Sequence, residues 1–339
     1  MDTKLPTIKQ IAKQLNVSVS TVSRALANHP RIGLGTKERV QKLAKEIGYE
    51  PNTQAIFFKQ KKTFIIGVVL PFIREEFFSQ AICGIETSAL LHNYTILFGQ
   101  SYDDMETEKR VVDIMKKQRV DGLIISLSKN TNNYEHLKAF EKHNIPIVYF
   151  DRVPELDGVN KVYCDLFKGT IEIVTHLYNA GCRRIALING PQKLAASKER
   201  LKGYMKGIEK QKLKIDMQLV ELSDFSKEST YLAMKNLLVQ KNPPDAIISF
   251  NDYVHMDAVQ YAKQKKLRVN KDIFFASYAN LPITDYTSHP PMISLEQYPV
   301  LQGEKAMEIM IKLIHQNADN SITSNITYNE QITATLIKH

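Results

Sequence analysis

Residues 7–26 constrain the fold of this 339-residue chain more than any other segment, because their spacing predicts two short amphipathic helices joined by a turn. In the first helix the apolar residues recur at i, i+3, i+4 and i+7, which places them on one helical face. Thr7 and Gln10 predict a capping box at its start, and Ser18 can cap the second helix after a turn at Asn16. This arrangement is typical of a helix-turn-helix.

The outer face of the second helix has the chemistry needed to bind the major groove of DNA. Ser20, Thr21 and Arg24 are expected to lie on this face. An arginine can donate two hydrogen bonds to guanine, and the hydroxyls can bind a base edge or a phosphate. The pattern alone is weak, because any two amphipathic helices resemble it.

The distribution of charge supports the same interpretation. Residues 1–62 hold twelve Lys and Arg against four acidic residues, a net charge of +8, whereas the whole chain carries +9. A basic surface confined to the segment with the motif favours phosphate binding over an ordinary solvated surface. Residues 36–47 predict a third helix, ended by Gly48 and Pro51, so residues 1–50 should form a small three-helix headpiece.

Composition argues against membrane, exported and metal-binding proteins. The chain is 43% hydrophobic and 24% charged, which is ordinary for a globular protein with a sizeable core. No apolar run approaches the roughly 18 residues of a membrane span, and the N-terminus lacks the apolar core of an export signal. The three cysteines, Cys83, Cys164 and Cys182, are odd in number and lack metal-ligand spacing. We therefore expect a cytoplasmic protein with reduced thiols, no bound metal and no membrane partner.

Strands and helices alternate after residue 63. Residues 64–71 form a continuous apolar run that ends at a proline, as expected of a strand buried on both faces. Two successive series of this kind predict an α/β body with two parallel-sheet, Rossmann-like lobes and a cleft between them. Because such sheets bind ligands beyond the carboxyl ends of their strands, the loops there are the candidate ligand site.

Several short motifs occur in order along nearly the whole chain. They are Thr7-Ile-Lys-Gln-Ile-Ala12, Val17-Ser-Val-Ser-Thr-Val-Ser-Arg-Ala-Leu26, Gly48-Tyr-Glu-Pro-Asn52, Ile66-Gly-Val-Val69, Arg119-Val-Asp-Gly-Leu-Ile-Ile125, Phe150-Asp-Arg152, Arg200-Leu-Lys-Gly-Tyr204, Asn251-Asp252 and Pro290-Pro291. Together they resemble the lactose repressor (LacI/GalR) family of bacterial transcription regulators. The resemblance implies an all-α helix-turn-helix headpiece followed by a bilobed α/β body similar to periplasmic binding proteins.

The resemblance also implies domain boundaries and a homodimer. The expected parts are the headpiece at 1–50, a hinge at 51–62, a first lobe at 63–163 and 294–325, and a second lobe at 164–293 and 326–339. The strand at residues 293–297 should return to the first lobe with the last helix. The final strand, at 333–337, should return to the second lobe, so that the chain crosses between the lobes three times.

The resemblance implies that Val19, Ser20 and Arg24 read the bases of double-stranded operator DNA and that Thr21 and Ser23 lie nearer its backbone. It also implies a hinge that becomes helical on DNA and contacts the DNA through Asn52, Ala55 and Phe58. Phe58 stands where the family usually has a Leu wedge, so we predict that it inserts between base pairs and kinks the DNA. The alternative is that Phe58 packs on the protein like any linker aromatic residue.

The resemblance further implies a small-molecule effector bound between the lobes, for which we expect a saccharide. The residues assigned to it are Phe77, Ser126, Asp151, Asp165, Arg200, Phe225, Asn251 and Gln297. Carboxylates, amides and a guanidinium suit adjacent sugar hydroxyls, because each can bond two oxygens at once. Two points stay open: Asp151 and Arg152 could form a structural ion pair, and Ala279 replaces an Asp that is common in the family.

An enzyme is not expected. The sequence has no phosphate-binding Walker loop, no dinucleotide glycine fingerprint, no nucleophile elbow and no paired zinc histidines, and no cofactor is implied. The alternative is a solute-binding protein of a transport system, which the basic headpiece and the missing export signal disfavour. We therefore predict a ligand-responsive transcription regulator, and a repressor in particular.

Overall fold

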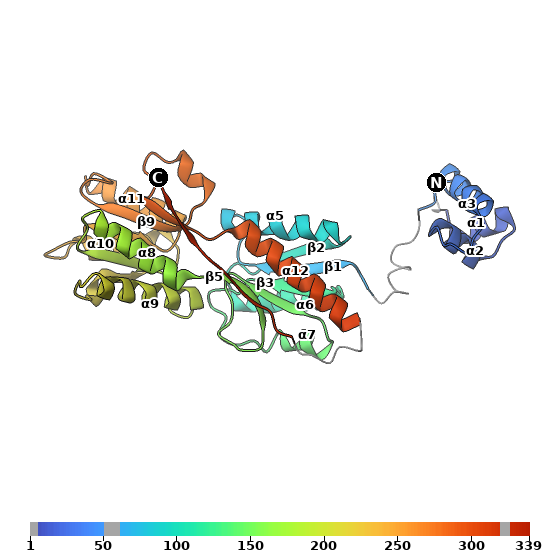
Figure 1. The fold of residues 1–339 in the computed structure, drawn as a ribbon, viewed down its shortest axis with the longest axis horizontal. Helices are drawn as coiled ribbons and strands as arrows, with labels where there is room; N and C mark the ends of the chain where they lie inside the picture. Colours follow the sequence, from blue (N-terminus) through green and yellow to red (C-terminus); the bar gives the residue numbers. More distant parts are fainter. Residues whose placement is uncertain (1–5, 51–61, 319–325) are drawn as a thin grey trace. The chain divides into compact units, whose positions relative to one another are not determined.

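In the computed structural model, residues 6–50, 62–318 and 326–339 are described (Figure 1). The chain forms two compact units, Met1–Thr63 and Phe64–His339. Among the described residues, no helix is both long enough and apolar enough to cross a membrane.

The described residues of the first unit form helices α1 (Ile8–Leu15), α2 (Val19–Leu26) and α3 (Leu34–Glu46). The predicted capping box of Thr7 and Gln10 is present, and the Ser18 hydroxyl accepts the backbone N–H of Thr21 at 3.0 Å. Asn16 makes the turn in the left-handed conformation. The helices enclose a small core whose fully buried members are Ile11, Val22, Ala25 and Val40.

The first lobe of the second unit has a six-stranded parallel sheet in the order β11-β5-β4-β3-β1-β2. Its strands are β1 (Ile65–Leu70), β2 (Thr95–Gln100), β3 (Gly122–Ile125), β4 (Ile147–Phe150), β5 (Asn160–Cys164) and β11 (Asn329–Ile332). Its helices are α5 (Glu76–Leu91), α6 (Met105–Lys117), α7 (Lys138–Lys142) and α12 (Pro299–Ala318).

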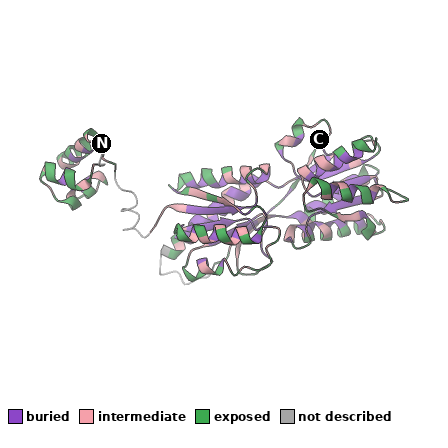
Figure 2. Ribbon diagram, turned by 180° about the vertical axis from the view of Figure 1, so that it is seen from behind, coloured by how far each residue is buried: buried purple, intermediate pink, exposed green. Residues whose placement is uncertain are grey.

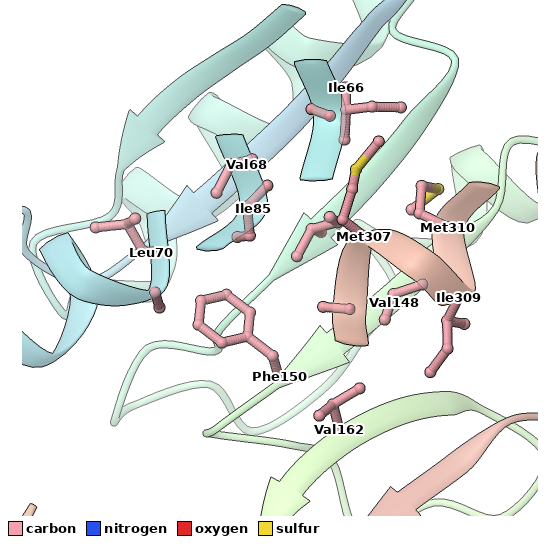
Figure 3. Packing of buried hydrophobic residues seen from close by; sticks show 14 of the residues in the cluster. Ile66, Val68, Leu70, Ile85, Val148, Phe150, Val162, Met307, Ile309 and Met310 are labelled. Carbon is pink, nitrogen blue, oxygen red and sulfur yellow. The ribbon is translucent and has the colours of Figure 1, made fainter. Parts of the chain in front are cut away.

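Helices α5 and α12 pack on one face of this sheet, and Figure 3 shows apolar side chains of both filling the space against β1 and β4. The two helices approach closely at Gly84, where an added Cβ would lie 2.1 Å from the carbonyl oxygen of Val300. Only glycine fits at that crossing. This packing fixes the position of α5, which begins shortly after the carboxyl end of β1.

The second lobe has a sheet in the order β12-β10-β9-β8-β6-β7, with only β12 antiparallel. Its strands are β6 (Ile185–Asn189), β7 (Val220–Leu222), β8 (Ala246–Ser249), β9 (Phe274–Ala279), β10 (Ile293–Glu296) and β12 (Thr335–Lys338). Its helices are α8 (Leu166–Asn179), α9 (Ala195–Lys210), α10 (Lys227–Leu238) and α11 (Asp252–Gln264), with short 3-10 helices at Met217–Leu219 and Pro282–Tyr286. Figure 2 shows that the central strands of both sheets, among them β3 and β4 in the first lobe and β6 and β8 in the second, are buried.

Two details of the expected lobe division are wrong. Strand β10 pairs with β9 and so belongs to the second sheet, where Leu295 packs against Gly169 of α8. Strand β11 pairs with β5 and so belongs to the first sheet, although residues 326–339 were assigned to the second lobe. Strands β10 and β11 have four residues each, and the pattern of so short a strand does not identify the sheet in which it pairs.

The chain nevertheless crosses between the lobes three times, after β5, after β10 and after β11. These crossings place the carboxyl ends of the strands of both sheets around one cleft.

Candidate functional site

Helix α2 presents the predicted polar surface to solvent. Val19 is 41% exposed, Ser20, Ser23 and Arg24 are exposed, and Thr21 is half-buried. The hydroxyl of Ser18 is 2.8 Å from those of both Ser20 and Thr21, so it orders the first turn of this surface. The hinge residues Asn52, Ala55 and Phe58 lie outside the described residues, and their roles stay predictions.

A hollow lies between the two lobes, with about 520 Å³ of space that includes open solvent at its mouth, and we call it the arginine cavity after Arg200. The residues that line it stand at the carboxyl ends of strands β1, β4, β6, β8, β9 and β10 or in the segments that come after these ends in the sequence. The lining residues are Glu75, Phe77, Phe78, Asp151, Arg152, Leu194, Ala196, Arg200, Phe250, Asn251, Tyr253, Ala279, Leu281 and Gln297. The cavity therefore has the position that the parallel-sheet rule predicts.

Arg200 is the most distinctive group in this cavity. Its guanidinium carbon lies 3.9 Å from the ring centre of Phe250 and 4.4 Å from that of Tyr278, and the residue is only 4% exposed. Its Nε and Nη1 groups are buried, and neither has a hydrogen-bond partner among the described residues. Burial lowers the pKa of Arg200 to about 10, so the side chain is charged at neutral pH. Unsatisfied donors on a buried cation call for an acceptor from a ligand.

Asp151 follows β4 in the left-handed conformation, with φ of 55°. Burial raises the pKa of its carboxyl to about 6, while the charges of Arg152 and Arg200 and a hydrogen bond from Ser126 oppose that shift. Burial also raises the pKa of the Glu75 carboxyl in the same cavity. The arginine cavity therefore combines the buried, unpartnered donors of Arg200 with two carboxyl groups whose pKa is raised by burial.

Arg152 forms a buried ion pair, but its partner is Asp103 rather than the neighbouring Asp151. Asp103 also accepts the backbone N–H of Lys129 at 2.9 Å. The guanidinium of Arg152 lies 5.5 Å from the ring of Phe78 and 5.8 Å from that of Phe225 in the second lobe. Arg152 is therefore held by the first lobe and contacts both lobes.

The structure brings together five of the eight predicted effector residues as lining of the arginine cavity: Phe77, Asp151, Arg200, Asn251 and Gln297. Three others do not line it. Ser126 is fully buried behind Asp151, and Asp165 caps α8 by accepting the N–H of Lys168. Phe225 packs on Phe250, with ring centres 4.5 Å apart, and it is Phe250 that lines the cavity.

Sequence reasoning missed several lining residues, among them Phe250, Tyr253 and Leu281. Each follows the end of a parallel strand, which is the signal that could have found them. Among the described residues, no group of three or more His, Cys, Asp or Glu side chains could hold a metal ion.

A helix-turn-helix unit followed in the chain by two α/β lobes with a cavity between them is typical of one class of protein, the ligand-responsive transcription regulators. Residues 7–52 match the family model of bacterial regulatory proteins of the lacI family. Residues 63–339 match that of periplasmic binding proteins and the sugar-binding domain of the LacI family. The chain belongs to the LacI family, so it is a DNA-binding transcription regulator and not a transport solute-binding protein.

Relatives and solved structures agree with this family. The transcriptional repressor CytR of Escherichia coli is 30% identical over 90% of this chain and 89% of its own length. The repressor PurR of Klebsiella pneumoniae is 28% identical over 94% and 93%, respectively. A lac repressor dimer bound to operator and the anti-inducer ONPF has the same fold, with a TM-score of 0.85 at 24% identity over 99% of this chain and 98% of that one.

Proposed function

We propose that this protein is a homodimeric repressor that binds operator DNA through α2 and changes its operator affinity when a small polar effector occupies the arginine cavity. The observation that carries the proposal is the buried guanidinium of Arg200, whose Nε and Nη1 groups lack partners among the described residues. Because unsatisfied buried donors are costly, a ligand that accepts their hydrogen bonds should favour one arrangement of the lobes.

Helix α2 supports the DNA half of the proposal. Val19, Ser20 and Arg24 are exposed on one helix, so all three can reach base edges when it enters a major groove. Thr21 and Ser23 then lie nearer the phosphates. The positive charge of residues 1–62 supplies the salt-dependent part of the affinity.

The lining of the arginine cavity supports a hydroxylated effector, for which a saccharide is the first candidate. Asp151, Asn251 and Gln297 offer carboxyl and amide groups from both lobes. The neighbouring structures include a CelR–cellobiose complex, at 24% identity. Ala279 lines the cavity where relatives commonly have a carboxylate, so hydroxyl recognition here falls to the other three residues.

A dimer is supported by the apolar surface of the first lobe. Leu90 and Leu91 at the end of α5, Phe98 on the edge strand β2 and Ile114 on α6 are all exposed large apolar side chains. Burying such residues against a second copy is favourable. Its relatives are transcriptional repressors, so we propose that the protein catalyses no reaction and acts in the cytoplasm, where the operator is.

The proposal is tested by two substitutions with opposite expected effects. Arg24→Ala should weaken operator binding by about 1–3 kcal/mol and relax preference at one base pair per half-site, while effector binding stays normal. Arg200→Ala should abolish the effector response and leave operator affinity within twofold. Both are measured by titrating labelled operator and random DNA with and without effector.

Each variant has a matched control. Lys37→Ala removes a headpiece charge and should weaken operator and random DNA alike. Arg183→Ala removes an exposed arginine that stacks on Tyr178 outside the cavity, and it should leave the response intact. Equal loss on both DNAs for Arg24→Ala would contradict its role as a base reader, and an intact response in Arg200→Ala would contradict the effector site.

A further inference from the structure

The connecting segments at one end of the second lobe bring together side chains that are far apart in the sequence. Strands β6 to β10 are parallel, so the segments that precede them all lie at the amino edge of the sheet, opposite the arginine cavity. Strand β12 ends at the same edge, because Lys338 pairs with Ile293, the first residue of β10. We call this end of the lobe the basic pole. It comprises residues 180–184, 210–219, 239–245, 265–273, 287–292 and 338–339.

The basic pole is strongly positive, although the body as a whole is nearly neutral. Its segments hold eleven Lys and Arg against three acidic residues, a net charge of +8. Residues 63–339 together carry only +1, so the rest of the body is net negative, at −7. Ten of the eleven basic side chains are exposed, and that of Arg184 is half-buried. Like charges held this close repel one another, and a bound polyanion would relieve that repulsion.

The three acidic residues of the pole do not neutralise its lysines. Asp245 accepts two backbone N–H groups of residues 183–184, at 2.7 and 3.0 Å. Asp216 and Asp272 each pair with an arginine of the pole. In the part of the chain that the structure describes, eight exposed lysines of the pole form no ion pair: Lys210, Lys212, Lys214, Lys241, Lys265, Lys266, Lys271 and Lys338. Each can therefore donate to an anionic group of a partner.

The chemistry of the basic pole favours double-stranded DNA as that partner. Its segments contain no Phe, Tyr or Trp, so they offer no ring on which an unpaired base could stack. The lysines come from four separate segments and not from one face of an amphipathic helix, which is the usual form of a membrane-surface site. Ammonium groups spread over a broad surface suit the repeated phosphates of a duplex. The protein belongs to a DNA-binding family, so this polyanion is present where it acts.

The basic pole lies far from the point where the chain enters the body from the headpiece. The first sheet is also parallel, so Ile65, the first residue of β1, stands at its amino edge. Both sheets direct their carboxyl edges to the cleft, so their amino edges are at opposite ends of the body (Figure 1). We propose that the basic pole binds the phosphate backbone of a second segment of double-stranded DNA, without regard to sequence, while the headpiece binds the operator.

The experiment asks whether the full chain, with its headpieces already occupied, retains a second duplex. An operator selected from a random duplex pool by the wild-type chain is fixed to beads in excess, and the protein is bound to it. A labelled duplex of random sequence is then added over a range of salt concentrations. We expect the wild type to retain it, and retention should fall steeply as salt rises, because each phosphate contact contributes about −0.9 to the logarithmic slope.

The test variant combines Lys212→Glu, Lys265→Glu and Lys266→Glu. It should lower retention of the random duplex by about tenfold or more and make its salt dependence shallower, because three phosphate contacts are lost. Operator affinity should stay within about twofold of the wild type, since the headpiece is unaltered. The three glutamine substitutions at the same positions remove the charges without adding new ones, so they should give a smaller loss in the same direction.

The matched control combines Lys142→Glu, Lys227→Glu and Lys312→Glu. All three lysines are exposed, lie outside the basic pole and form no ion pair among the described residues. Two of them lie over a tyrosine ring, as Lys265 does. The control changes the net charge by the same amount as the test variant, and it should retain the random duplex as the wild type does. The unfolding midpoint of each protein checks that it folds.

Four outcomes overturn the proposal. The wild type could fail to retain the random duplex, or a folded test variant could retain it undiminished. An equal loss in the control would show that retention follows net charge and not the basic pole. Phosphatidylglycerol vesicles and polyglutamate, offered in place of the random duplex, test for a membrane and for an acidic protein. Retention of either one in the absence of duplex retention overturns DNA as the partner.

Discussion

The DNA-binding surface and the effector cleft are built in opposite ways. Val19 to Arg24 lie within six consecutive residues of one helix, and most of their side chains are exposed. The lining of the arginine cavity comes from segments between Glu75 and Gln297, and many of its side chains are buried. The first surface depends on local structure, whereas the second depends on the packing of both lobes.

This contrast has an electrostatic consequence. Charges on α2 remain in water and are available to phosphates and bases. In the cleft, Asp103 and Arg152 are 4% and 8% exposed, so their charges need partners inside the protein. Substitutions of exposed side chains on α2 should therefore affect recognition alone, whereas substitutions of buried charges in the cleft should affect stability and recognition together.

The largest expected effect is on the buried ion pair. Asp103→Ala leaves the guanidinium of Arg152 without its carboxylate and removes the acceptor of the Lys129 N–H. We expect a loss of about 3–5 kcal/mol in the free energy of unfolding of the body. Urea unfolding of the full chain, followed by circular dichroism, measures it.

Asp113→Ala is the matched control on α6, because Asp113 pairs with Lys116 and Lys117 at the surface. Exposed pairs contribute little, so this variant should unfold like the wild type. Amide exchange in α1 to α3 should be unchanged in both variants. Faster exchange there in Asp103→Ala would break the independence of the two units.

The next effect is a dependence of the stability of the body on pH. Burial raises the pKa of Asp252, the first residue of α11, to about 7, and its carboxylate accepts the N–H of Leu281 at 2.8 Å. Between pH 4 and 7 the folded protein keeps a proton that the unfolded chain has lost. The stability contributed by this group therefore falls as pH rises through that window, by an upper limit of about 4 kcal/mol.

Asp252→Asn has no such proton and keeps an acceptor for Leu281. Its stability relative to the wild type should therefore rise from pH 4 to pH 7, as measured by thermal unfolding at each pH. Burial lowers the pKa of His255 to about 4, which gives the opposite slope in the same window, so the comparison with the wild type isolates Asp252. A constant difference between the two proteins would show that Asp252 does not titrate there.

The same contrast explains what could be predicted from the sequence. The helices of the headpiece and the caps at Thr7 and Ser18 were predictable, because each depends on spacing over a few residues. Asp151 and Asn251 were also predictable as cleft residues, since each directly follows a buried strand.

Long-range pairing was not predictable. Arg152 forms its ion pair with Asp103, 49 residues away in the sequence, and not with the adjacent Asp151. The rings on either side of Arg200 come from β9 and the end of β8, where aromatic residues in apolar runs resemble ordinary core. Periodicity assigns a face to a residue but does not identify its partner across a sheet or between lobes.

The smallest expected effect concerns the cap of the DNA-binding helix. Ser18→Ala removes the acceptor for the N–H of Thr21 and the hydroxyl shared with Ser20 and Thr21. Loss of such a cap costs about 1 kcal/mol, which should speed amide exchange in α2 and α3 about fivefold while leaving the body unchanged.

Ser226 provides a matched control in the body, because its hydroxyl caps α10 by accepting the N–H of Ser229 at 3.2 Å. The loss of this cap is a smaller fraction of the total stability in the body, because the body has a larger core than the headpiece. Ser226→Ala should therefore speed amide exchange in α10 and leave operator affinity unchanged. Ser18→Ala should weaken operator binding as well, since the headpiece must be folded to bind. Equal operator affinity in the two variants would mean that DNA restores the first turn of α2 without its cap, and that this surface is less dependent on local structure than the comparison with the cleft implies.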